Sequence, residues 1–85
     1  MPEISKFYGI IITMFLQEHN PPHFHVRYNE YRALIDIQTG ELTGNLPRRV
    51  IHLVYEWLDA HKDELMENWR RIESGEELQK IKPLD

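Results

Sequence analysis

A chain of 85 residues can bury one core but hardly two, so we expect a single domain over residues 1–85. The absence of cysteine excludes disulfides and thiolate metal sites and suits the reducing cytoplasm, where we expect the protein to reside. The net charge of -4 arises in residues 51–85, which carry nine acidic and five basic side chains, whereas residues 1–50 carry five of each. A protein that coats nucleic acid without sequence preference is usually basic, so this charge balance excludes that class, and any contact with RNA has to be confined to one part of the surface.

The first predicted element is a strand over about 7–17, where isoleucine and aromatic residues form an almost continuous run. This run is too short to cross a bilayer, and no signal-peptide cleavage site accompanies it, so we expect no membrane partner. It predicts a strand covered on both faces for part of its length. The helices would cover one face, and either the C-terminal tail or a second copy of the chain would cover the other, which leaves a homodimer open.

Alternating patterns predict two more strands, over about 23–28 and 31–37, joined by a tight hairpin at Asn29-Glu30. The pattern leaves open a short fourth strand over 41–43. These strands follow one another closely in the chain. They therefore predict an antiparallel β-meander of three to four strands.

Apolar residues at helical spacing predict two helices, over about 47–60 and 62–74, and Gly75 ends the second. The tail over 76–85 carries three apolar residues and either lies along the domain or frays. Strands followed by two helices predict an α+β fold in which both helices pack on one face of the sheet.

Polar side chains gather on one face of the predicted hairpin. Side chains alternate along a strand, and the apolar set has to face the core. A turn at Asn29-Glu30 sets Arg27 opposite Arg32 and His23 opposite Asp36. Two facing arginines repel each other unless an anion lies between them. The outward patch contains two imidazoles, two guanidinium groups and a carboxylate, from His23, His25, Arg27, Arg32 and Asp36.

These residue types fit the cleavage of RNA without a metal or another cofactor. His25 would take the proton of the 2′-hydroxyl group, His23 with Asp36 would protonate the leaving oxygen, and Arg27 or Arg32 would stabilise the phosphorane. The competing interpretation is structural: the imidazoles are exposed at a sheet edge, and His23 and Asp36 form an ordinary cross-strand pair.

A metal site is a second interpretation of the same segment. His23 and His25 project from one face, and His19 could curl back over Pro21-Pro22 to complete a zinc site of three imidazoles with an open position. The rigid prolines oppose this arrangement because they tend to hold His19 away from the strand.

A third interpretation is a non-enzymatic module that binds a protein partner through exposed aromatic and aliphatic side chains. Tryptophans at helical spacing are more typical of a core than of such a surface. Arg48-Arg49 opens the first predicted helix and is either solvated or reaches the sheet patch, where it would add binding cations.

Motifs along most of the chain resemble those of one protein family. The most specific is the block His19-x-Pro-Pro-His-Phe-His-Val at 19–26. It is accompanied by Met-Pro-x-Ile-Ser-x-Phe at 1–7, Gly9, Met14-Phe15, Tyr28, Ala33, Gly44-x-Leu-Pro at 44–47, Trp57, Glu64-Leu65 and Glu67-Asn68-Trp69. Together they resemble the small bacterial family called domain of unknown function 4160. Glu18 stands where many members of that family have aspartate.

The resemblance implies a bacterial protein that is often encoded beside a second small protein, an arrangement typical of toxin-antitoxin pairs. It implies no catalytic residues. With the histidine and arginine patch, it leads us to expect the toxin-like component of such a pair, acting on RNA, with the neighbouring gene's product as its partner. The alternative is a non-enzymatic module that binds a partner or senses a metal.

Overall fold

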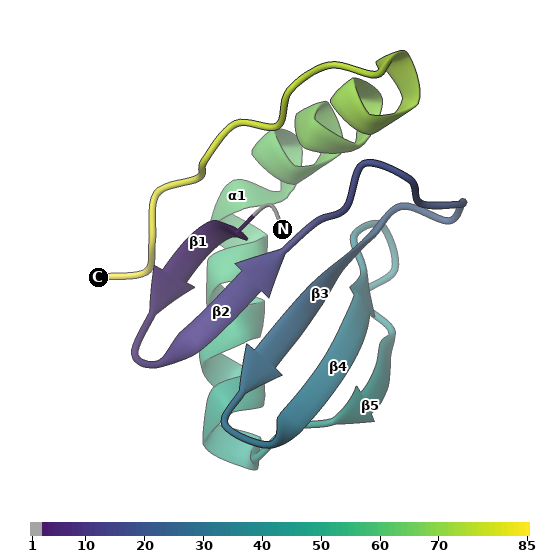
Figure 1. Cartoon of the computed structure of the whole chain (residues 1–85). Coiled ribbons are helices and arrows are strands. Elements are labelled where there is room, and N and C mark those ends of the chain that lie inside the picture. Colours follow the sequence, from purple (N-terminus) through teal and green to yellow (C-terminus); the bar gives the residue numbers. More distant parts are fainter. Residues whose placement is uncertain (1–2) are drawn as a thin grey trace.

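The computed structural model describes residues 3–85, which form an α+β fold with one antiparallel sheet and one helix (Figure 1). Within these residues the sheet has five strands in the order β1-β2-β3-β4-β5. The elements are β1 (Glu3–Phe7), β2 (Ile10–Thr13), β3 (His23–Tyr28), β4 (Tyr31–Asp36), β5 (Leu42–Asn45) and α1 (Arg48–Ser74). Met1 and Pro2, where the first motif quoted above begins, lie outside the described residues.

The prediction of a single strand over 7–17 is wrong, because the chain reverses direction at Tyr8-Gly9. Tyr8 and Gly9 have φ angles of 51° and 78°, the left-handed conformation that a two-residue turn between antiparallel strands requires. Phe7 of β1 therefore pairs with Ile10 of β2. The apolar run hid this turn because a tyrosine at positive φ is uncommon.

The hairpin of β3 and β4 has the predicted register. Arg27 pairs with Arg32 and His23 pairs with Asp36. Asn29 has a φ angle of 53°, which asparagine tolerates better than most residues. The fourth strand that the sequence left open is present as β5, which pairs with β4.

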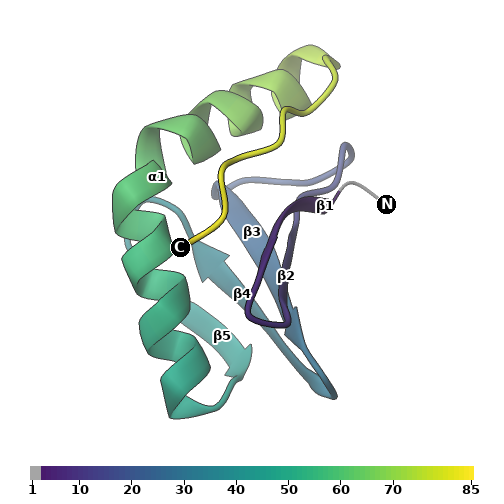
Figure 2. The ribbon, with the colours of Figure 1, turned by 90° about the vertical axis from the view of Figure 1, so that its left-hand side faces the viewer.

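The two predicted helices, 47–60 and 62–74, form one helix, α1, with a kink at His61. His61 has φ -128° and ψ 21°, but neither glycine nor proline follows it, so helical hydrogen bonding resumes at once. The first half of α1 covers one face of the sheet, and the kink turns the second half toward the loop over residues 14–22 (Figure 2). In the described part of the chain, no helix combines the length and the apolar character that crossing a membrane requires.

The core lies between the sheet and α1, with Trp57 at its centre. The ring of Trp57 lies 5.5 Å from that of Phe7 and 5.8 Å from that of Phe24. The tail over 76–85 lies along the domain, one of the two alternatives left open above. The backbone N–H of Ile81 donates to the carbonyl of Ile4 in β1, so the tail follows the β1 edge and leaves the other face of the sheet bare (Figure 1).

Candidate functional site

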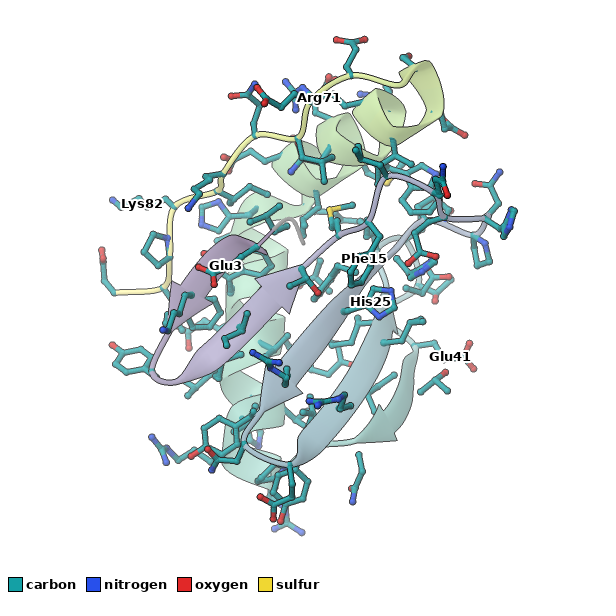
Figure 3. The ribbon with its side chains drawn as sticks, viewed as in Figure 1. Glu3, Phe15, His25, Glu41, Arg71 and Lys82 are labelled. Carbon is teal, nitrogen blue, oxygen red and sulfur yellow. The ribbon has the colours of Figure 1, made fainter. Side chains whose placement is uncertain are left out.

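The face of the sheet that α1 leaves uncovered, here called the outer face, holds a cavity of about 400 Å³. Residues of β2, β3 and β4 form its floor, and Phe15 borders it from the following loop. Figure 3 shows Phe15 and His25 together on this face. Their ring centres are 4.8 Å apart. The polar side chains that line the cavity include Glu3, Thr13, His25, Arg27 and Arg32.

Arg27 and Arg32 lie opposite each other in this cavity, as the hairpin register predicts. Both residues are exposed, and within residues 3–85 neither forms an ion pair. Two facing guanidinium groups repel each other, and an anion between them removes the repulsion. The cavity lining combines these two guanidinium groups with one carboxylate, that of Glu3, and so has a local excess of positive charge in a chain whose net charge is negative.

The loop over 14–22 brings a carboxylate against the two imidazoles of β3. Glu18 Oε1 lies 2.6 Å from His25 Nε2 and 3.4 Å from His23 Nε2. On its other side, His23 Nδ1 donates to the carbonyl oxygen of Pro21 at 2.8 Å. We call Glu18, His23 and His25 the Glu-His cluster.

The two imidazoles differ in their access to solvent. The side chain of His23 is 9% exposed and that of His25 is 33% exposed. Both ring nitrogens of His23 face protein groups, whereas His25 also lines the outer-face cavity. His25 is therefore the imidazole that can meet a ligand in this cavity.

Electrostatics keep Glu18 ionised. Partial burial raises the pKa of this carboxyl, but the hydrogen bond from His25 and the charges of His23 and His25 outweigh burial and hold the pKa below its ordinary value. An ionised carboxylate can only accept hydrogen bonds. His25 therefore donates from Nε2 to Glu18, which leaves Nδ1 of the neutral ring as the acceptor.

The second half of α1 holds the loop of the cluster in place. Trp69 Nε1 donates to Asn20 Oδ1 at 3.2 Å, and the Trp69 ring lies 5.3 Å from the ring of His23. Trp69 is buried. The helix that closes the core thus also positions Glu18, through its contact with the same loop.

Asp36 has a local role in the structure. It pairs with His23 in the sheet register, but its Oδ1 atom accepts the backbone N–H groups of Gln38 and Thr39, both at 2.8 Å. Among the described residues, Asp36 forms no ion pair with His23. The carboxylate that contacts the imidazoles is Glu18, which the sequence patterns did not assign to the site.

His19 and the helix-start arginines lie apart from the other predicted site residues. Among residues 3–85, the histidine and carboxylate side chains whose ligand atoms converge are those of Glu18, His23 and His25. His19 is exposed and does not belong to this group. Arg48 and Arg49 are exposed at the start of α1 and do not line the outer-face cavity. The structure therefore joins His25, Arg27 and Arg32 but not these three residues.

Comparison with known proteins supplies the last observation. A search of curated proteins found no match, and a search of solved structures found none either. A family model described as a domain of unknown function, DUF4160, matches residues 9–70. This match spans well over half of the 85 residues and includes the histidine block, β2 to β5 and most of α1. The chain belongs to the DUF4160 family.

Proposed function

We propose that this protein binds and cleaves RNA in the outer-face cavity, as the toxin-like member of a two-gene pair. The observation that carries the proposal is that His25 and the facing pair Arg27 and Arg32 line one cavity of about 400 Å³. A phosphate group between the two guanidinium groups would relieve their repulsion. The same phosphate would then lie beside an imidazole able to move a proton.

Cleavage by the RNA's own 2′-oxygen requires a base and a cationic site for the phosphorane. His25 Nδ1 takes the proton of the 2′-hydroxyl group while the 2′-oxygen bonds to phosphorus. The bond to the 5′-oxygen breaks, water protonates that oxygen, and the imidazolium returns its proton to the solvent. Glu18, hydrogen-bonded to His25 Nε2, stabilises the imidazolium, and Arg27 with Arg32 binds the phosphate.

The direct test is the incubation of pure protein with single-stranded RNA in EDTA. We expect products ending in 2′,3′-cyclic phosphate, and no cleavage of DNA of the same sequence, which lacks the attacking hydroxyl group. His25→Ala should lower the rate by about 10² or more, because it removes the base. The variant His19→Ala, which removes an exposed histidine outside the cavity, should cleave RNA like the native protein. Intact RNA with the native protein would rule out metal-free cleavage.

A growth measurement tests the toxin-like role. Induced expression of the protein alone should slow growth, and co-expression of the neighbouring gene should restore it, since the pair implied by family resemblance places the partner there. Unimpaired growth in both cases contradicts the toxin-like role. A protein that leaves RNA intact yet binds the neighbouring gene's product would instead be the non-enzymatic module considered above.

A further inference from the structure

We infer that Glu18, His23 and His25 bind one divalent transition-metal ion through two imidazole nitrogens and a carboxylate oxygen. The inference goes beyond RNA binding and does not depend on it. One ligand atom from each of the three side chains lies within 4.8 Å of the others, so small movements would bring all three onto one ion. Both imidazoles direct Nε2 toward the same carboxylate oxygen, Glu18 Oε1.

The hydrogen bond of His23 on its far side supports this assignment. A carbonyl oxygen can only accept, so the bond to Pro21 fixes the proton of neutral His23 on Nδ1. This leaves Nε2 of the neutral ring as the nitrogen available to a metal ion, and it lies 3.4 Å from Glu18 Oε1. An ion bound here would take the place of the proton that His25 Nε2 shares with Glu18.

The contact with Pro21 is also the support that metal-bound histidines usually have. A ligand histidine almost always donates its second ring nitrogen to a carbonyl or carboxylate group, which fixes the ring and its tautomer. His23 has this support before any ion is bound. The rings of Phe15 and Trp69 border the cluster and restrict the movement of both imidazoles.

The ligand set defines the class of metal. Imidazole nitrogen suits zinc, iron(II), cobalt(II) and nickel(II), whereas magnesium and calcium prefer oxygen ligands alone. Two histidines and a glutamate occur in catalytic zinc sites, where three protein ligands leave a fourth position for water or an anion. Glu18 thus takes the place that sequence patterns assigned to His19, because the carboxylate of Glu18 is the group that lies close to both imidazoles.

The experiment is a titration of untagged, metal-free protein with Zn²⁺ by calorimetry and with Co²⁺ by visible absorption, in the absence of RNA. We expect one ion per chain and a Co²⁺ spectrum typical of nitrogen and oxygen ligands. Glu18→Gln keeps the shape of the side chain and should lower Zn²⁺ affinity at least about tenfold. His25→Asn should have a similar effect, and His19→Gln, the matched control in the same loop, should bind like the native protein.

Three results would overturn the inference: no binding of Zn²⁺ or Co²⁺, equal losses in His19→Gln and Glu18→Gln, or equally tight binding of Mg²⁺ at the same residues. Far-ultraviolet circular dichroism checks that each variant folds, and if Glu18→Gln does not, His25→Asn decides. Because no RNA is present, a failure here leaves RNA cleavage untouched, and intact RNA in EDTA leaves the metal site untouched.

Discussion

Gly44 is a residue at which the backbone leaves no room for a side chain. A Cβ atom there would lie 2.5 Å from the carbonyl oxygen of Arg32 and 2.8 Å from Cα of Ala33, at a φ angle of 117°. We expect Gly44→Ala to lower the free energy of unfolding by about 3 kcal/mol through this clash and strain. Gly75→Ala is the matched control, with a φ angle of 73° in open space, and should lose only about 1 kcal/mol. Equal losses in urea denaturation would contradict the role of Gly44.

Some residues of the candidate site are positioned by neighbours in the sequence, and others by contacts with distant parts of the chain. His25, Arg27 and Arg32 could be placed on one face because strand alternation and hairpin register are local rules. Glu18 could not, because its position depends on where the loop turns back. That turn is held by the hydrogen bond between Trp69 and Asn20, 49 residues apart, and no sequence period connects them. The sequence signal that could have pointed to Glu18 is that this carboxylate directly precedes the histidine block.

At the scale of elements, the order of strand and helix segments along the chain is predicted correctly, but their number is not: the structure has five strands and one helix instead of three to four strands and two helices. β3, β4 and the apolar stripe of α1 follow regular periods and were correctly identified. The turn between β1 and β2 was missed because its first residue is a tyrosine in the left-handed conformation. The apolar spacing predicts two helices where the structure has one kinked helix, since spacing alone cannot tell a bent helix from two helices.

Two buried side chains of α1 hold the tail, those of Trp57 and Asn68. Trp57 Nε1 donates to the carbonyl of Lys82 at 2.9 Å. Asn68 donates to the carbonyl of Gln79 at 2.9 Å and accepts its N–H group at 3.0 Å. We expect Asn68→Ala to lower the free energy of unfolding by about 2 kcal/mol, since it leaves two backbone groups of the tail without these partners. Hydrogen exchange at Gln79 and Ile81 should accelerate. Arg70→Ala, exposed on the same helix, should change neither quantity, and equal exchange in both variants would show that Asn68 does not hold the tail.

At the scale of the whole molecule, the two faces of the sheet differ in what covers them. α1 buries one face and supplies the core with Trp57 and Trp69. The outer face stays bare and carries Arg27 and Arg32 in a cavity, with the Glu-His cluster at its border through His25. The acidic excess lies in residues 51–85, mostly in α1 and the tail, so it does not cancel the local positive charge of the outer face.

The most direct test of the outer face as the functional surface is the affinity for a fluorescent single-stranded RNA, measured by anisotropy at fixed, low salt. Two double variants remove the same charge from different places: Arg27→Gln with Arg32→Gln in the cavity, and Arg48→Gln with Arg49→Gln at the start of α1. Loss of the cavity pair should weaken binding about tenfold or more, because the proposed function has these two arginines contact phosphate, whereas loss of the helix pair should weaken it less than about threefold. Equal weakening by both pairs, or no binding by the native protein, would contradict the assignment of the outer face.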